Sequence, residues 1–343
     1  MPLLLGTCLS LMVTASPGTA SDSPPDYHGF NEGRFLPYLN ADGSDLTRPP
    51  RLGLSFGGRV IPAVMDSGST GIVVAADLIP DWQSLPSTGE GRITYTSSGR
   101  IMRGQWVTTP VTIEGADGAS ISTSPLPVLA VTEVDCLDTA RDCTPSDDPH
   151  GIAMIGIGFA REHDAQAQGT PDKNPFLNLK PHEGRSLRKG YILTQQGAHV
   201  GLTAANTEGS FRFVKLARQE KVDDWAGIPG CISINGQTPP ACGTMLVDSG
   251  VAAMFVTLPP AQAGDNEGSL PPGTTVSLQV GPAEQAQDLY SFSADDGASS
   301  LAPSAIHLRV SPSRVFVNTS LHILNGFDVL YDADGGYAGF RQR

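Results

Sequence analysis

Two short segments of the chain share a residue pattern that could place two carboxylates in one site. Val64-Met-Asp66-Ser-Gly and Leu246-Val-Asp248-Ser-Gly each join apolar residues to an aspartate, a serine and a glycine. The apolar residues predict a buried strand, and the glycine permits a sharp turn after it. We therefore expect each aspartate at a rigid strand end. The hydroxyl group of Ser67 or Ser249 next to it could then hydrogen-bond across to the other loop.

Two such loops placed face to face would bring Asp66 and Asp248 close together. Like charges at that distance cannot both ionise, so the two carboxyl groups would share one proton and titrate as a pair. One carboxylate can then act as a base on a water molecule while the other, protonated, polarises a carbonyl group. A single Asp-Ser-Gly is usually only a turn. Two copies after buried strands, about half a chain apart, instead favour a duplicated, two-lobed protein.

The elements that must position these loops are short strands joined by turns. The chain contains 39 glycines and 28 prolines without a period, which is typical of many short strands rather than long helices. We expect residues 21 to about 50 to form a loose arm, and residues 161–190 to form a surface connection with one short helix. Alternating or continuous apolar runs predict strands at 60–65, 71–76, 107–113, 126–131, 152–159, 191–194, 199–203 and 210–216, and hairpins at 92–101 and 326–340.

Composition excludes several classes of function. The formal net charge is −13, and such a surface repels a phosphate backbone, so we do not expect nucleic-acid binding. No stretch of about 18 apolar residues follows the first residues, which predicts no membrane span. Zinc-peptidase, P-loop and dinucleotide motifs are absent from the sequence, and no metal site is expected.

The chain begins with an apolar run followed by small residues. This pattern predicts a signal peptide over residues 1–20, cleaved after Ala15 or Ala20, although the usual positive charge is missing and a buried strand is the alternative. Cys8 would be removed with it. The other four cysteines form two local pairs, Cys136 with Cys143 and Cys231 with Cys242. In an exported chain, secreted or periplasmic, they predict two short-loop disulfides; four free thiols are the alternative.

The motifs together resemble the pepsin-like aspartic peptidases, from about residue 50 to the C-terminus. Asp66-Ser-Gly-Ser-Thr resembles the first catalytic loop of that family, and Asp248-Ser-Gly resembles the second. Ile93-Thr-Tyr95, followed by Ser97-Ser-Gly99, resembles the flap hairpin whose tyrosine closes over the substrate. Ala153-Met-Ile-Gly156 resembles the strand that crosses behind the first catalytic loop. The pair Cys231 and Cys242 resembles a disulfide often found before the second aspartate.

The resemblance implies an all-β, bilobal pepsin-like fold, with two six-stranded-barrel-like lobes around a central cleft. The first lobe would span residues 21–190 and the second 191–343. It implies an aspartic endopeptidase, a divergent bacterial exported member, that acts as a monomer on an extended peptide or protein and needs no metal or organic cofactor. The implied site comprises the catalytic Asp66 and Asp248, the supporting Ser67, Gly68, Ser69, Ser249 and Gly250, and the flap residues Tyr95, Ser97 and Gly99.

The second half of the chain departs from the family pattern in two places. Val251 stands where the pattern has a threonine or serine three residues after the second aspartate, whereas Ser69 follows the pattern after the first. Without that donor, the pKa of Asp248 is expected to rise. The segment 317–320 carries no glycine where the pattern has one; its Asn-Thr-Ser is formally a glycosylation sequon. These departures leave two alternatives: a catalytically impaired peptide-binding protein on the same scaffold, or a cell-envelope structural or inhibitor-capturing module.

Overall fold

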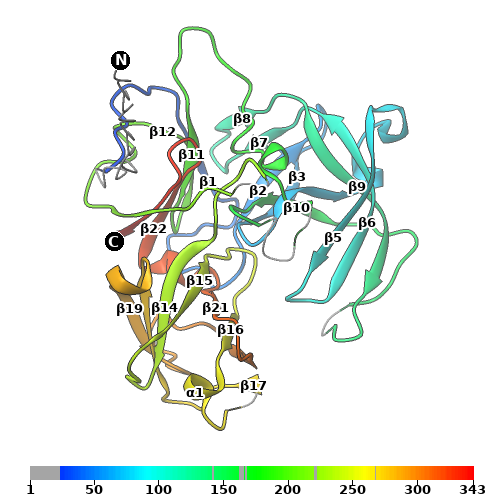
Figure 1. Cartoon of the computed structure of the whole chain (residues 1–343). Helices are drawn as coiled ribbons and strands as arrows, with labels where there is room; N and C mark the ends of the chain where they lie inside the picture. Colours follow the sequence, from blue (N-terminus) through cyan, green and yellow to red (C-terminus); the bar gives the residue numbers. More distant parts are fainter. Residues whose placement is uncertain (1–23, 141–142, 162–165, 167, 220–221, 267) are drawn as a thin grey trace, which may run out of the picture.

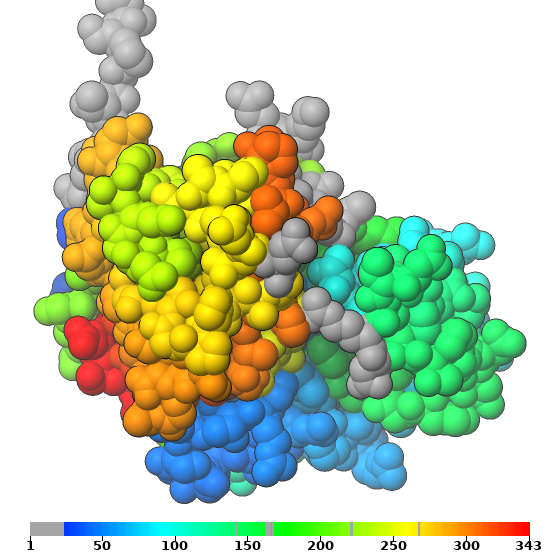
Figure 2. Space-filling view, turned by 90° about the horizontal axis from the view of Figure 1, so that it is seen from below, coloured from blue at the N-terminus to red at the C-terminus, as the bar shows by residue number. Residues whose placement is uncertain are grey.

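The chain forms two lobes whose regular secondary structure is mostly β-strand (Figure 1). The computed structural model describes residues 24–343 except 141–142, 162–165, 167, 220–221 and 267. The expected signal peptide and Cys8 lie outside the described residues. Seen from below, the C-terminal lobe, in yellow and orange, stands beside the N-terminal lobe, in cyan and green (Figure 2). The all-β, bilobal architecture predicted from the sequence is confirmed.

The N-terminal lobe contains one large sheet with the order β5-β6-β9-β4-β10-β3-β2-β7-β8 among the described residues. The inner strand β4 is buried along its whole length and consists largely of β-branched residues, which pack well on a pleated surface. The strands are β2 (Arg51–Ser55), β3 (Ile61–Asp66), β4 (Thr70–Ala75), β5 (Ser87–Tyr95), β6 (Arg100–Thr109), β7 (Thr112–Glu114), β8 (Ser120–Ser122), β9 (Leu126–Cys136) and β10 (Ala153–Ile157).

The C-terminal lobe contains a second large sheet with the order β17-β20-β16-β21-β15-β14-β18-β19 among the described residues. Alternate residues of β18 and β16 are buried, as expected for strands with one face on the core. The strands are β14 (Ile228–Ile234), β15 (Ala241–Leu246), β16 (Met254–Leu258), β17 (Gly268–Ser269), β18 (Thr275–Val280), β19 (Gln287–Ser293), β20 (Ile306–Val310) and β21 (Phe316–Asn318).

A third sheet, with the order β1-β12-β11-β22-β23-β13, brings both ends of the described chain together (Figure 1). Its strands are β1 (Arg34–Pro37), β11 (Arg188–Leu193), β12 (Gly197–Leu202), β13 (Arg212–Lys215), β22 (Phe327–Asp332) and β23 (Tyr337–Gln342). The hairpin predicted near the C-terminus is β22 and β23. The lobe boundary expected at residue 190 falls inside β11 and stays a prediction.

The prediction of a loose arm over residues 21–50 is wrong for the described part of this segment, which starts at residue 24. Strand β1 pairs with β12 through four residues, and Leu36 and Tyr38 are fully buried. The hydroxyl group of Tyr27 donates a hydrogen bond to the buried Asp332 at 3.2 Å. These long-range contacts hold the segment against the third sheet, although its Asp, Pro, Gly and Asn content is typical of an irregular arm.

Each lobe passes one strand between the two strands that flank an Asp-Ser-Gly loop. In the N-terminal lobe, β10 pairs parallel to β3 and antiparallel to β4. In the C-terminal lobe, β21 pairs parallel to β15 and antiparallel to β16. Gly156 of β10 must be a glycine, because a Cβ there would lie 2.5 Å from the carbonyl oxygen of Gly71. The repeated topology matches the echo seen in the sequence.

Helices among the described residues are few and short. They are the α-helix α1 (Pro260–Ala263) and the 3-10 turns η1 (Ala76–Leu78), η2 (Trp82–Ser84), η3 (Pro171–Lys173), η4 (Ala283–Gln285) and η5 (Leu321–Asn325). The short helix expected within residues 161–190 is the three-residue turn η3. None of the helices in the described ranges has the length and apolar character needed to cross a membrane.

Candidate active site

The two Asp-Ser-Gly loops meet and are tied to each other by their serines. The Ser67 backbone N–H donates to the Ser249 hydroxyl oxygen at 3.0 Å, and the Ser249 N–H donates to the Ser67 hydroxyl oxygen at 2.9 Å. The hydroxyl groups in turn donate to the carbonyl oxygens of Val247 and Met65, both at 2.8 Å. Both serines are buried, so these reciprocal bonds fix the loops face to face.

The two aspartates lie against the glycines of the opposite loops. The Gly68 N–H donates to Oδ1 of Asp66 at 2.7 Å, and the Gly250 N–H donates to Oδ1 of Asp248 at 2.9 Å. A Cβ built on Gly68 would lie 2.4 Å from the carboxylate oxygens of Asp248. One built on Gly250 would lie 2.4 Å from Oδ1 of Asp66 and 3.2 Å from Oδ1 of Asp248. The two Oδ1 atoms therefore face the same small space, and only glycine leaves room for them.

Burial and the closeness of the two carboxyl groups make simultaneous ionisation of Asp66 and Asp248 unfavourable. Asp66 is 4% exposed and Asp248 is 7% exposed. Burial, and after it the negative charge of Asp66, raises the pKa of Asp248 to about 7, while the hydrogen bond from Asn318 and the positive charge of Arg161 act in the opposite direction. Two carboxyl groups that interact in this way do not readily ionise together, so they share one proton, and their titration belongs to the pair.

The outer oxygens of the two carboxylates have different donors. The hydroxyl group of Ser69 donates to Oδ2 of Asp66. The equivalent position in the second loop is Val251, which cannot donate. Asn318, at the end of β21, donates from Nδ2 to Oδ2 of Asp248 at 2.6 Å, and its own Oδ1 accepts the backbone N–H of Ser320 at 3.0 Å. The hydrogen bond expected to be missing at Asp248 is therefore supplied from another strand.

Sequence reasoning missed Asn318 as a site residue. It is 6% exposed, and its amide group is engaged on both sides. The available signal was the coincidence of two departures in one lobe, an apolar Val251 and a polar Asn318. Taken alone, each departure suggests that Asp248 has lost a hydrogen-bond donor. Taken together, they replace the hydroxyl donor of the pattern with the amide group of Asn318.

The hairpin predicted to be a flap is formed by β5 and β6, and its turn lines the cleft that contains the pair Asp66 and Asp248, called the dyad below. Tyr95 lines the same cleft as Asp66, and burial, and after it the negative charge of Asp66, raises the pKa of Tyr95. Its side chain also packs against the cluster that contains Ile93 and Met102. Gly99 takes a φ of +82° at the turn, and its N–H donates to the Tyr95 carbonyl oxygen at 2.8 Å. Ser97, at the tip, lines the cleft.

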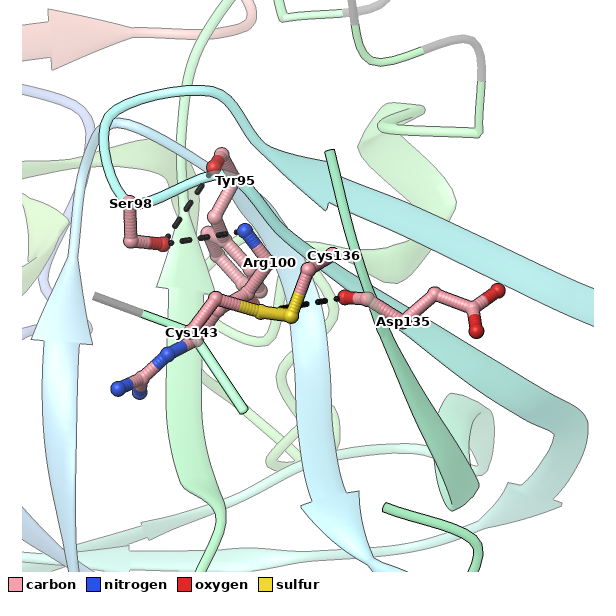
Figure 3. Close-up of a disulfide and its surroundings, with 6 residues drawn as sticks. All are labelled: Tyr95, Ser98, Arg100, Asp135, Cys136 and Cys143. Carbon is pink, nitrogen blue, oxygen red and sulfur yellow. Dashed lines mark hydrogen bonds between the residues drawn. A yellow bond between two sulfur atoms is a disulfide. The ribbon is translucent and has the colours of Figure 1, made fainter. Parts of the chain in front are cut away.

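One disulfide supports the flap turn (Figure 3). Cys136 is bonded to Cys143, and Cys136 pairs in register with Arg100, the first residue of β6 after the hairpin turn. The loop that this bond closes contacts the turn, because a Cβ on Gly99 would lie 2.4 Å from Cα of Ala140. The second predicted disulfide, Cys231–Cys242, is also present and links the paired strands β14 and β15, the latter leading to Asp248.

A cleft of about 800 Å³ runs over the dyad between the lobes. The flap residues 94–98 line one side, and residues of β16 and β20 line another. Asp66 and Asp248 lie in the same cleft, with Gly68, Gly250, Val251 and Asn318 around them. Within the described ranges, no three histidine, cysteine, aspartate or glutamate residues are grouped so that they could hold a metal ion.

This arrangement of two lobes, crossing strands and opposed Asp-Ser-Gly loops is the fold of the pepsin-like aspartic proteinases. A solved structure with this fold is the aspartic proteinase from Irpex lacteus. It is 13% identical in sequence, and the match covers 91% of this chain and 97% of that chain with a TM-score of 0.53. At this identity the likeness shows the fold alone. No protein-family model matches the chain, and no curated protein matches it.

Proposed function

We propose that this protein is an aspartic-type endopeptidase that hydrolyses peptide bonds with a water molecule activated between Asp66 and Asp248. The observation that carries the proposal is the pair of reciprocal hydrogen bonds between Ser67 and Ser249. These bonds hold each buried carboxyl group against the glycine of the opposite loop. A pair that keeps one proton provides a base and an acid in one place. That combination is what direct attack of water on an amide requires.

The proposed reaction needs only these two groups. The ionised carboxylate takes a proton from the water molecule as the water oxygen bonds to the carbonyl carbon. At the same time the protonated carboxyl group donates its proton to the carbonyl oxygen. The tetrahedral intermediate collapses when the C–N bond breaks: the protonated carboxyl group gives its proton to the leaving nitrogen, and the ionised carboxylate takes the proton from one of the two hydroxyl groups of the intermediate as that oxygen becomes the new carbonyl oxygen. The products are a new carboxyl end and a new amine, and the pair returns to its single-proton state. The cleft would hold the substrate extended beneath the Tyr95 hairpin, as strand-like peptides bind.

Support for the enzyme over an impaired binding protein comes from Asn318. Val251 was the main reason to doubt the dyad, and the amide of Asn318 supplies the donor that Val251 lacks. The two disulfides are compatible with an exported protein. We propose that the enzyme is exported and acts as a monomer.

The test is cleavage of a mixed peptide library from about pH 3 to about pH 7 by the natural chain, Asp66→Asn and Asp248→Asn. We expect cleavage by the natural chain only, because each variant leaves one carboxyl group without its partner. Thermal unfolding of all three proteins controls for folding. A folded natural chain that cleaves nothing at any pH would refute the enzyme and leave a peptide-binding protein.

A further inference from the structure

The described residues that line the cleft have the opposite balance of charge from the whole chain. Over the whole chain 35 aspartates and glutamates outnumber 22 lysines and arginines. Among the described residues that line the cleft, the only carboxylates are the dyad itself, and the other charged side chains apart from histidine are all arginines: Arg51, Arg100, Arg161, Arg309 and Arg314. An acidic protein has thus gathered arginines, and none of its other described acids, around its proposed catalytic pair.

The arginines come from both lobes. Arg51 begins β2, and Arg100 begins β6, the second strand of the flap hairpin; both lie in the N-terminal lobe. Arg309 lies in β20, and Arg314 precedes β21 in the C-terminal lobe, where its guanidinium group stacks 4.9 Å from the ring centroid of Phe316. A peptide lying in the cleft would therefore meet cationic side chains on both sides of the dyad.

Two of these residues are suited to contact a ligand. Arg51 and Arg309 are exposed side chains on strands whose ends line the cleft, one from each lobe. A guanidinium group stays charged across the whole pH range in which carboxyl groups titrate, and its planar donors match a carboxylate in a bidentate arrangement. The acidic remainder of the surface disfavours acidic ligands elsewhere, so it directs them to this cleft.

We propose that the cleft selects peptide segments that carry aspartate or glutamate beside the bond to be cleaved, with Arg51 and Arg309 among the residues that bind those carboxylates. This inference rests on the proposed endopeptidase function and adds the substrate class. It predicts recognition by charge at side chains on either side of the scissile bond. The apolar lining near the dyad, including Val251 and Phe255, remains for the residues at the bond itself.

The experiment uses a fluorogenic peptide that the chain cleaves, in matched forms with glutamate or the neutral, isosteric glutamine at single flanking positions. We expect kcat/KM to be about tenfold higher for the glutamate form at one or more positions. The preference should shrink when NaCl rises from about 0.05 M to about 0.5 M, because salt screens exposed charges. Arg51→Gln and Arg309→Gln should each lower the glutamate-to-glutamine ratio by about threefold or more. The matched control is Arg59→Gln, an exposed arginine outside the cleft, which should keep the ratio.

Failure of this inference is separable from failure of the enzyme. Cleavage with equal kcat/KM for glutamate and glutamine forms at every position would overturn the substrate class alone. If the chain cleaves no peptide, fluorescence anisotropy measures binding of the same labelled pairs to the natural chain. Tighter, salt-sensitive binding of the glutamate form would support acidic-peptide recognition by a protein that is not an enzyme, and equal binding would overturn it.

Discussion

Asn318 donates a hydrogen bond from Nδ2 to Oδ2 of Asp248 at 2.6 Å, and so does for this aspartate what the hydroxyl group of Ser69 does for Asp66. Ser69 reaches its aspartate from three residues along the same loop. Asn318 reaches Asp248 from a neighbouring strand, where β21 pairs with β15 and places Asn318 opposite Leu246. The two halves of the site therefore satisfy equivalent oxygens by different routes.

The exchange of a hydroxyl for an amide has a chemical consequence. A hydroxyl group can donate or accept, whereas the NH₂ group of asparagine can only donate. Oδ2 of Asp248 must therefore be an acceptor, and a proton on Asp248 belongs on Oδ1, which faces Asp66 across the space between the loops. The Asn318 amide fixes both the rotamer of Asp248 and the side on which it is protonated.

The first prediction concerns this donor. Asn318→Ala should lower kcat/KM by about tenfold to a hundredfold, the value of one hydrogen bond to a charged group. The bond stabilises the ionised form of Asp248, so its loss should raise the pKa of Asp248 further and move the alkaline limb of the pH profile to higher pH. The measurement is kcat/KM as a function of pH for the natural chain and the variant.

A second substitution makes this test specific. Adding Val251→Thr to Asn318→Ala places a hydroxyl group at the position from which Ser69 serves Asp66, and it should restore much of the rate and the original alkaline limb. Thermal unfolding of each protein separates a lost donor from a lost fold. A single variant with an unchanged profile, or a double variant with no recovery, would show that Asn318 does not act through Asp248.

Much of the site could be predicted because its signals are local. An apolar run followed by Asp-Ser-Gly predicts a buried strand, a turn and the place of the carboxylate, and cysteines 7 and 11 residues apart favour disulfides that close short loops. Asn318 and β1 could not be predicted in this way. The contact of Asn318 joins residues 70 apart and depends on the register of β21. Strand β1 is four residues long and is held by β12 and by burial of Leu36 rather than by its own pattern.

The second prediction concerns stability and pH. The pKa of Asp248 is about 7 in the folded chain and about 4 when unfolded, so between these values the folded state binds more protons. Protonated Asp248 therefore adds its full share to the free energy of unfolding below about pH 4, and this share is lost as the pH rises to about 7. The loss should be on the order of a few kcal/mol.

Urea unfolding at about pH 4, 5.5 and 7 measures this effect as a difference between proteins. Asp248→Asn cannot ionise, so its free energy of unfolding should fall less steeply with pH than that of the natural chain. Asp265→Asn, at an exposed position, is the matched control and should follow the natural chain. Parallel curves for the natural chain and Asp248→Asn would contradict the prediction.

The third prediction concerns the backbone behind the second loop. Asp66 lies opposite Gly156 in the pairing of β3 and β10. Continuing the register of β15 and β21 two residues beyond Leu246 and Asn318 places Ser320 opposite Asp248. Ser320 has φ +63° and ψ −176°, a region occupied almost only by glycine that costs about 1–3 kcal/mol for other residues. Ser320→Gly should therefore raise the free energy of unfolding by about 1 kcal/mol.

Ser320→Ala separates the backbone effect from the side chain. Alanine keeps the strained Cβ and removes the hydroxyl oxygen that accepts the His322 N–H at 3.3 Å. We expect it to lower the free energy of unfolding, in contrast to glycine. If glycine is the less stable of the two variants, the positive φ is not the dominant cost at this position.

The last prediction concerns the disulfide beneath the flap. Cys136→Ser with Cys143→Ser should lower the free energy of unfolding by about 2–3 kcal/mol, the value expected for a short closed loop. The loop also contacts the flap turn at Gly99, where the Leu137 N–H donates to the Gly99 carbonyl oxygen at 2.8 Å. Its release should speed hydrogen exchange at residues 95–100 and raise KM more than it lowers kcat, because a loosened flap weakens substrate binding before it disturbs the dyad.

The other disulfide provides the matched control, since both closed loops are short. Cys231→Ser with Cys242→Ser opens the link between β14 and β15 and should cost a similar free energy of unfolding. It lies in the lobe opposite the flap, so exchange at residues 95–100 should stay as in the natural chain. Equal flap exchange in the two double variants would mean that general destabilisation, and not the contact between the disulfide loop and Gly99, sets the mobility of the flap.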